Sequence, residues 1–228
     1  MSTAIVHLGV LAGLRSEARC ISPPRDGERL SVALSAARRS LAEAACARLI
    51  AEGATHLLSF GLAGGLDPAL PPGTLLLPDL LVFPDGTEHG VDTAWHARLS
   101  AACNDLKPII GRHLGADLAV ADAAEKTALF IRTSALAVDM ESHILAKAAA
   151  AAGRRFAILR VVCDAADEAL PPAALAGVKP DGSTDILGVL GSVLRHPGQI
   201  PALGRLARSA KTAERVLALC GNRLFEPA

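Results

Sequence analysis

The sequence predicts an α/β layer fold with a mixed sheet, because short apolar runs alternate along it with segments of helical periodicity. Three apolar runs carry this prediction. Ala4–Leu11 has the pattern of a buried strand and stops at Ala12-Gly13. Thr55–Phe60 has the same pattern, and Phe156–Val162 is typical of a strand in a parallel sheet. The length of 228 residues fits a single domain of this class.

The other elements can be predicted in order along the chain. The further strands that we expect are Arg29–Leu34, Thr74–Leu77, Leu80–Phe83, Ala116–Ala121 and Ala135–Val138. The helices that we expect are Ser40–Glu52, Trp95–Leu106, Ala123–Thr133 and Glu141–Ala152. The last of these is apolar on all sides, which indicates a helix packed on more than one side. The glycines that follow Phe60 are expected to stop that strand.

The C-terminal region differs in composition, but we interpret it as part of the same domain. Residues 1–228 are therefore expected to form one domain, in which residues 170–228 are an apolar helical subregion. Its most apolar positions are Ile186, Leu187, Val189, Leu190, Val193 and Leu194. They fit either ordinary core packing or a channel for a long hydrocarbon.

The composition excludes several classes of protein. The 23 basic residues equal the 23 acidic ones, so the chain lacks the charge of a nucleic-acid-binding protein. The five cysteines form no CxxC pair, which argues against a disulfide framework or a metal site and fits the reducing cytoplasm. No stretch approaches the ~18 apolar residues of a membrane-spanning helix. We therefore expect a cytoplasmic protein, with transient contact with a membrane surface left open.

Three carboxylates follow predicted strands. Glu17 lies shortly after the first strand, and Glu141 lies at the start of a helix. Asp164 follows the strand Phe156–Val162. Acids at the edge of a sheet suit a reaction in which one group holds a sugar hydroxyl and another protonates a leaving group, while a third acts on water. This combination indicates an enzyme that cleaves nucleosides.

Three motifs extend this interpretation. They are the glycine-rich stretch Ser59–Leu66, the sequence VDMES at Val138–Ser142 and the sequence RVVCDAAD at Arg160–Asp167. In this order they resemble the purine and uridine phosphorylase superfamily, and within it the nucleosidase branch that cleaves methylthioadenosine and adenosylhomocysteine. The resemblance implies a three-layer nucleoside phosphorylase-like fold with a central mixed β-sheet flanked by helices. It also implies a homo-oligomer, with a homodimer favoured, and no cofactor.

The C-terminal sequence points to a narrower group. Residues 180–207, together with the short chain and the absence of Tyr, resemble nucleosidase-like proteins of bacterial hopanoid biosynthesis, which remove adenine from adenosylhopane. This resemblance implies an adenine nucleoside with a lipid 5′ substituent as the substrate, and ribosylhopane as the product.

The resemblance also implies roles for the acidic residues and their neighbours. Asp164 corresponds to the general acid that protonates the adenine ring, and Glu141 to the acid that binds ribose, with Met140 packed against the sugar. Glu17 corresponds to the acid that activates water, and Arg160 to the arginine that helps to hold that water. Each position also fits a structural role: Asp164 as a helix cap, Glu141 and Glu17 in a first helical turn, Met140 in the core, and Arg160 as a solvent-facing strand residue.

Further positions complete the expected binding site. Asp139 belongs to the ribose-binding motif, and Gly64 and Gly65 allow the backbone to approach a ligand closely. The backbone near Val120 is expected to contact the base, because the aromatic residue that stacks on adenine in the family has no counterpart here. The chain also has Leu62 where the nucleosidases have Ser.

Water and phosphate remain alternative nucleophiles. Phosphorolysis needs several cationic donors, and Arg15, Arg19, Arg38 and Arg39 are the candidates to bind phosphate as a second substrate. Glu17 would repel phosphate and suits water, so the sequence favours a purine nucleosidase (N-glycosyl hydrolase) over a nucleoside phosphorylase. The alternatives are hydrolysis of methylthioadenosine, adenosylhomocysteine or futalosine, and a non-catalytic nucleoside- or lipid-binding protein.

Overall fold

The computed structural model describes residues 7–24, 27–175, 179, 181–183, 192 and 195–226. The six apolar positions that we expected to form either a channel or core, between residues 186 and 194, lie outside the described residues. The same holds for residues 4–6 of the first predicted strand.

The described strands form one mixed sheet of nine strands. They are β1 (His7–Ala12), β2 (Arg29–Leu34), β3 (His56–Gly65), β4 (Leu75–Leu76), β5 (Leu80–Val82), β6 (Glu88–Gly90), β7 (Arg112–Gly115), β8 (Ala137–Asp139) and β9 (Arg155–Asp164). The order is β2-β1-β3-β8-β7-β5-β6, and β9 pairs with β3 and β4. Strand β1 pairs in parallel with both β2 and β3, and β3 also pairs in parallel with β9. Strand β8 pairs with β3 antiparallel. The predicted mixed sheet is confirmed.

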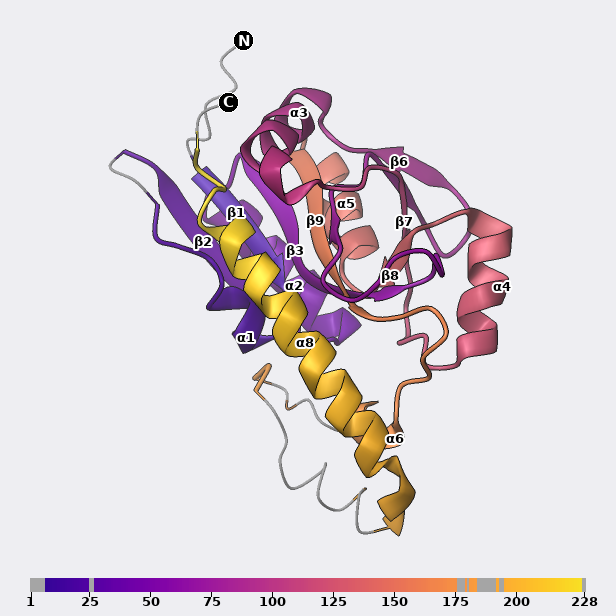
Figure 1. The fold of residues 1–228 in the computed structure, drawn as a ribbon. Coiled ribbons are helices and arrows are strands. Elements are labelled where there is room, and N and C mark those ends of the chain that lie inside the picture. The colour runs from indigo at the N-terminus through magenta and orange to yellow at the C-terminus, as the bar shows by residue number, and fades with distance from the viewer. Residues whose placement is uncertain are drawn as a thin grey trace.

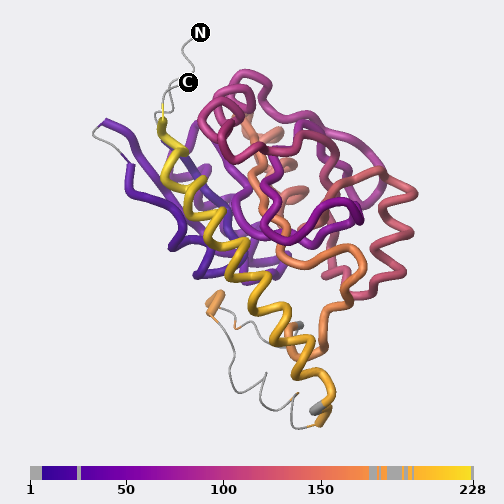
Figure 2. The backbone as a smooth tube through the Cα atoms, viewed as in Figure 1, coloured from indigo at the N-terminus to yellow at the C-terminus, as the bar shows by residue number. Residues whose placement is uncertain are grey.

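Helices cover both faces of this sheet. The helical elements are α1 (Arg15–Ala18), α2 (Arg39–Ala51), α3 (Thr93–Ala102), a 3-10 turn (Asn104–Leu106), α4 (Ala123–Thr133), α5 (Ser142–Ala151), α6 (Pro172–Leu175), a second 3-10 turn (Pro197–Gln199) and α8 (Ile200–Gly221). In Figure 1, α8 crosses one face of the sheet while α2 and α5 lie behind the other. The backbone trace in Figure 2 shows the same layers.

Alternation along the strands explains the three layers. In β9, Leu159 and Val161 pack in a core with Leu217 of α8, whereas Phe156 and Ile158 pack in a second core with residues of α2 and α5. Because successive side chains of a strand point to opposite faces, an apolar run buried on both faces needs helices on both. The three-layer arrangement that the resemblance implied is confirmed.

The glycine-rich segment differs from its prediction. We expected Gly61–Gly65 to end the strand, but β3 continues through Gly65 and stays paired with β9, with a register shift after Ala63. The glycines serve a close approach instead of a turn. A Cβ at Gly61 would lie 2.6 Å from Glu17 Oε1, so a side chain at this position would displace the carboxylate.

Strands β6 and β7 and the helix between them also differ from the elements that the sequence predicts. The strand expected at Ala116–Ala121 lies earlier, at Arg112–Gly115, and the short edge strand Glu88–Gly90 was missed. Both strands carry polar side chains, which hide the apolar pattern of a strand. The helix expected at Trp95–Leu106 ends at Ala102 and is followed by the first 3-10 turn.

Within the part of the chain that the structure describes, no helix is both long enough and apolar enough to cross a membrane. Helix α8 spans 22 residues but is amphipathic: Ala213, Leu217 and Cys220 are buried, and its other side is charged. It packs mainly on β9 and β3.

Candidate active site

The ends of four strands surround one cavity of about 410 Å³. Residues at or just beyond the ends of β1, β3, β8 and β9 line it, and α8 closes one side with Leu206, Ala210 and Glu214. Ligands of open α/β sheets bind at such strand ends, where connecting segments diverge and leave a crevice. The cavity contains Glu17, Glu141 and Asp164, so the structure brings together the three carboxylates singled out in the sequence.

Asp164 is the last residue of β9 and is only 6% exposed. Its Oδ2 accepts a hydrogen bond of 2.5 Å from Lys126 Nζ, a buried side chain of α4. Burial raises the pKa of Asp164, and the charge of Lys126 opposes this rise. Because the desolvation effect is the larger one, the carboxyl keeps a proton to a higher pH than an exposed aspartate does.

Lys126 is a site residue that the sequence analysis missed. Its Nζ also donates to the carbonyl oxygens of Ala165 at 2.8 Å and Glu168 at 2.7 Å. These three bonds use all three donors of an ammonium group, so Lys126 has none left for a ligand. The sequence could have indicated this position, because Lys126 lies one helical turn before Leu129 and therefore on the same, buried side of α4.

Glu141 follows β8 and precedes α5. Its Oε1 accepts from Ser35 Oγ at 2.9 Å and its Oε2 from Arg160 Nη2 at 3.3 Å. Burial raises the pKa of Glu141 to about 7, Arg160 opposes the rise, and the charges of Asp139 and Glu17 add to it. The carboxyl therefore changes charge near neutral pH. Ser35 was also missed, because it lies 106 residues away in the sequence.

Asp139 is fully engaged with other protein groups. Its Oδ1 accepts from the backbone N–H groups of Glu141 and Ser142 at 2.8 and 2.7 Å, and its Oδ2 lies 2.8 Å from His113 Nε2. Burial alone would raise the pKa of Asp139, but Arg160 and His113 outweigh it and hold the pKa well below its usual range. These contacts make Asp139 an anchor for the start of α5, and the expected contact with substrate stays a prediction.

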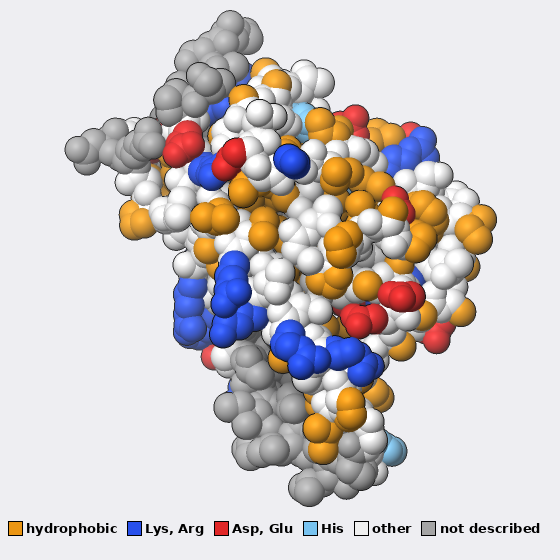
Figure 3. Space-filling view, in the orientation of Figure 1, with side chains coloured by type: hydrophobic (Ala, Val, Ile, Leu, Met, Phe, Trp, Pro, Cys, Tyr) orange, Lys and Arg blue, Asp and Glu red, His pale blue; other side chains and the backbone are white. Residues whose placement is uncertain are grey.

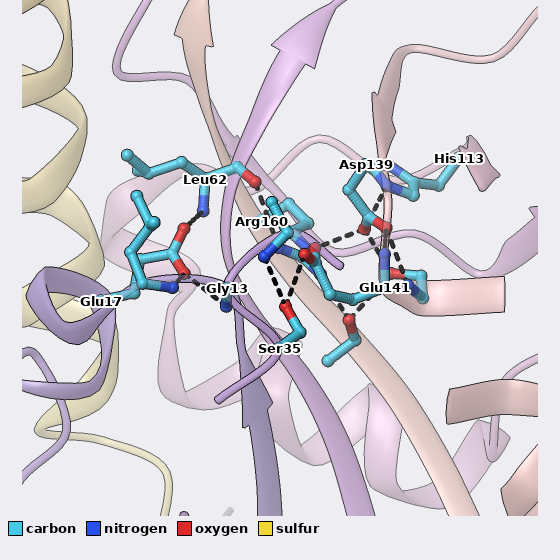
Figure 4. Close-up of polar contacts among 12 residues, drawn as sticks. Gly13, Glu17, Ser35, Leu62, His113, Asp139, Glu141 and Arg160 are labelled. Atoms are coloured by element: carbon cyan, nitrogen blue, oxygen red, sulfur yellow. Dashed lines mark hydrogen bonds and ion pairs between the residues drawn. The ribbon is translucent and has the colours of Figure 1, made fainter. Parts of the chain in front are cut away.

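Arg160 forms ion pairs with Asp139 and Glu141 but is not part of the cavity wall. Its guanidinium is 1% exposed and donates to Ser59 Oγ at 2.6 Å and to the Leu62 carbonyl oxygen at 3.1 Å. Its Nε forms an ion pair of 2.8 Å with Asp139. Figure 4 shows Arg160 between Glu17 on one side and Asp139 and Glu141 on the other. The solvent-facing alternative for Arg160 is therefore wrong, and its expected role in holding water stays a prediction.

Glu17 lies in α1 and is 3% exposed. Its Oε2 accepts from the N–H groups of Gly13 and Leu14 at 2.7 and 2.8 Å, and its Oε1 accepts from the N–H of Leu62 at 2.8 Å (Figure 4). Burial raises the pKa of Glu17, while Arg160 and these three N–H groups lower it. A Cβ added at Gly13 would lie 3.2 Å from both Glu17 Oε2 and Glu141 Oε1, so the two carboxylates flank this glycine.

The remaining predicted residues take different positions. Gly64, Met140 and Val120 line the cavity. A Cβ at Gly64 would lie 3.2 Å from Asp164 Oδ2, so glycine keeps space beside this carboxyl. Gly65 instead packs on β9, where a Cβ would lie 3.0 Å from the Asp164 carbonyl oxygen. The expected contact of Gly65 with a ligand stays a prediction.

The cavity wall is free of cationic side chains. No Arg or Lys occurs among the described residues that line it. Of the four candidate phosphate ligands, Arg15 pairs with Asp181 at 3.1 Å, and Arg39 pairs with Asp117 at 2.6 Å and Glu43 at 3.0 Å. The wall also contains no aromatic side chain within the described part of the chain, in line with the missing stacking residue.

Comparison with known proteins identifies the family. The family model described as the phosphorylase superfamily matches residues 26–186, which is more than half of the chain. The chain belongs to the phosphorylase superfamily, as the three motifs predicted. No curated protein sequence matches the chain.

Solved structures share the fold at low sequence identity. The methylthioadenosine/adenosylhomocysteine nucleosidase of Neisseria meningitidis, in complex with methylthio-immucillin-A, has a TM-score of 0.73 at 17% identity, covering 96% of this chain and 98% of that one. Futalosine hydrolase of Helicobacter pylori has a TM-score of 0.68 at 19% identity, covering 95% and 97%. The adenosylhomocysteine nucleosidase of Streptococcus pyogenes, in complex with 5-methylthiotubericidin, has a TM-score of 0.66 at 17% identity, covering 96% and 97%. These likenesses establish the nucleoside phosphorylase-like fold.

Proposed function

We propose that the protein hydrolyses the N-glycosidic bond of an adenine nucleoside, and that its substrate is adenosylhopane, from which it releases adenine and leaves ribosylhopane. The observation that carries the proposal is the convergence of Glu17, Glu141 and Asp164 on one cavity whose described wall has no cation. Three acids suit protonation, sugar binding and water activation, whereas a phosphate would meet no Arg or Lys side chain among the described residues of this wall.

Asp164 is the general acid of the proposed reaction. As the bond between C1′ and the base nitrogen breaks, its electron pair moves into the purine, and the ring accepts the proton of Asp164. The raised pKa of Asp164 supports this role, because burial lets this carboxyl keep its proton to a higher pH than an exposed aspartate does. Lys126 then stabilises the carboxylate that remains, since its ammonium lies 2.5 Å from Oδ2.

Glu141 binds the ribose in this proposal. In its ionised form it accepts hydrogen bonds from the sugar hydroxyls, and its negative charge stabilises the positive charge that develops on the ribosyl ring. The bonds from Ser35 and Arg160 hold the carboxylate in one orientation. Met140, which lines the cavity next to Glu141, packs against the sugar.

Glu17 activates the nucleophile. A water molecule beside its carboxylate attacks C1′ and gives up a proton to Glu17, and the products are free adenine and a sugar with a C1′ hydroxyl. Three backbone N–H groups hold the Glu17 carboxylate in place. The side chains of Glu17 and Arg160 both lie beside Gly61, because a Cβ added to this glycine would be within 2.8 Å of each of them.

The base and the 5′ substituent occupy the remaining walls. The peptide groups of Ala119 and Val120 make no hydrogen bond to another described residue, so they are available for the edge of adenine. One part of the wall is apolar. It consists of Leu170, Ala174 of α6, and Leu206 and Ala210 of α8. Such a wall supports a hydrocarbon as the 5′ substituent.

One assay tests the proposal directly. Adenine release is measured with adenosylhopane and with methylthioadenosine, each with and without inorganic phosphate. We expect adenosylhopane to be the better substrate by kcat/KM, with no dependence on phosphate and with ribosylhopane as the product. A strict requirement for phosphate and formation of a sugar 1-phosphate would replace hydrolysis by phosphorolysis. Preference for methylthioadenosine would overturn the lipid assignment, and failure to release adenine from either substrate would overturn the activity.

A further inference from the structure

The exposed side of α8 carries positive charge that the proposed reaction does not use. Arg205, Arg208, Lys211 and Arg215 are exposed, and their spacing of three or four residues places them along one side of the helix. The single carboxylate in α8, Glu214, is turned toward the cavity and lines it. The exposed side of this helix therefore presents four cations and no anion.

These cations are largely without ionic partners. Arg208, Lys211 and Arg215 form no ion pair with any residue that the structure describes, and Arg205 approaches Glu168 only at 3.8 Å. Arg19, exposed at the end of the neighbouring α1, adds a further cation. Figure 3 shows Lys and Arg side chains gathered over this part of the molecule. Because the whole chain has 23 basic and 23 acidic residues, the charge is local to this face.

The cavity lies on the side of α8 opposite these cations, across the helix diameter of about 10 Å. Leu206 and Ala210 of the same helix line the cavity, and so does Leu118, which is 78% exposed and lies at the rim. Two large apolar side chains flank the cations near the ends of α8: Ile200 is 55% exposed and Leu219 is 46% exposed.

We propose that the exposed side of α8 docks the protein on an anionic phospholipid surface and so holds the cavity, across the width of this one helix, near the layer that contains a lipid-linked nucleoside. Charge complementarity supports this partner. From Arg205 to Arg215 the helix extends about 15 Å at 1.5 Å per residue, so its cations reach several headgroups at once. The purpose of docking rests on the proposed function, but the existence of docking does not.

The packing of α8 defines the kind of contact. Ala213, Leu217 and Cys220 are buried in the core, so the apolar side of the helix is not available for insertion into lipid. Binding is therefore mainly electrostatic and reversible by salt. A nucleic acid would also attract four cations, but the exposed Ile200 and Leu219 suit the boundary between headgroups and acyl chains better than a phosphate backbone.

Vesicle sedimentation without any nucleoside tests the inference. The full-length protein is mixed with vesicles of phosphatidylcholine alone or of equal parts phosphatidylcholine and phosphatidylglycerol. We expect binding only to the anionic vesicles, with loss of binding in about 1 M salt, where the Debye length is about 3 Å. The double variant Arg208→Gln with Lys211→Gln should bind at least tenfold more weakly. The control, Lys107→Gln with Arg132→Gln, removes the same two residue types from other exposed sites and should bind like the wild type.

Several outcomes would overturn docking. These are equal binding to both kinds of vesicle, no binding to either, or an equal loss of binding in the test and control variants. Binding to a duplex oligonucleotide that depends on Arg208 and Lys211, without any preference for anionic vesicles, would assign the surface to nucleic acid instead. Adenine release from soluble methylthioadenosine is measured on every variant and should be unchanged, which separates a failure of docking from a failure of the proposed activity.

Discussion

The side-chain nitrogen of Lys126 lies 2.5 Å from Oδ2 of Asp164, and both side chains are buried. One carboxyl oxygen is thereby held by the protein, while Asp164 still lines the cavity. The same lysine binds two carbonyl oxygens of the segment that follows β9. Lys126 therefore connects the orientation of the proposed acid to the wall of the cavity, and it works as a positioning residue.

Replacement of the acid tests the proposed proton transfer. Asp164→Asn keeps the size of the side chain but cannot donate a carboxyl proton, so turnover should fall by roughly 10²-fold or more. Steady-state kinetics of adenine release measure the effect, and thermal unfolding shows whether the variant is folded. Near-normal turnover in a folded variant would remove Asp164 from the mechanism.

Replacement of Lys126 tests its influence on Asp164. Lys126 lowers the pKa of Asp164, so Lys126→Met should let burial raise that pKa further. Since the general acid works while protonated, the alkaline limb of the pH profile of kcat/KM should move to higher pH. Glu168 also raises the pKa of Asp164, and it does so in the wild type and in the variant, so the difference between them reports the effect of Lys126.

The control for this change is Lys126→Arg, which keeps a cation at the site. It should leave the alkaline limb closer to that of the wild type than Lys126→Met does. A purely structural lysine would change the rate or the stability in Lys126→Met without shifting the limb, and this result would contradict the assignment.

The ribose site should show its own pH dependence. The pKa of Glu141 is raised to about 7, and the ionised form is the one that accepts hydrogen bonds from the sugar. Activity should therefore fall as the pH decreases through about 7, because protonation removes the acceptor. Glu141→Gln should raise KM, lower kcat and abolish this acidic limb. If the limb persists in Glu141→Gln, it belongs to another group.

Glu17 can be tested by separating binding from chemistry. Glu17→Gln should lower hydrolysis by roughly 10²-fold or more, since the amide cannot accept the proton of the attacking water. Binding of a nucleoside analogue, measured by calorimetry, should remain within a few-fold of the wild type. Loss of binding with the same loss of hydrolysis would identify Glu17 as a structural residue.

The close approach of β3 to Glu17 predicts an effect on stability. A Cβ at Gly61 would lie 2.6 Å from Glu17 Oε1 and 2.8 Å from Arg160 Nη1. Gly61→Ala should therefore lower the free energy of unfolding by about 1–3 kcal/mol, the usual cost of overpacking a core. Chemical denaturation measures this, with Gly90→Ala as the control because nothing lies within 4 Å of a Cβ there. Equal stability of the two variants would show that β3 adjusts freely.

Most of the fold could be predicted because its elements have local patterns. Strand β2 and helix α4 occur at the predicted residues, and β9 extends its prediction by one or two residues at each end. The errors occur where local pattern and tertiary pairing disagree. Arg112 and His113 make β7 look polar, although its neighbours β5 and β8 pair with it on both sides.

The sequence by itself determined that the carboxylates follow strands, because apolar periodicity and motif spacing are properties of neighbouring residues. Only the tertiary structure decided what each carboxylate contacts. Lys126 reaches Asp164 across 38 positions of the chain, His113 reaches Asp139 across 26, and Ser35 reaches Glu141 across 106. Such pairings depend on strand order and helix packing, which bring distant residues together in the interior. Burial then changes the pKa of each acid, and no local pattern in the chain encodes the depth at which a side chain will lie.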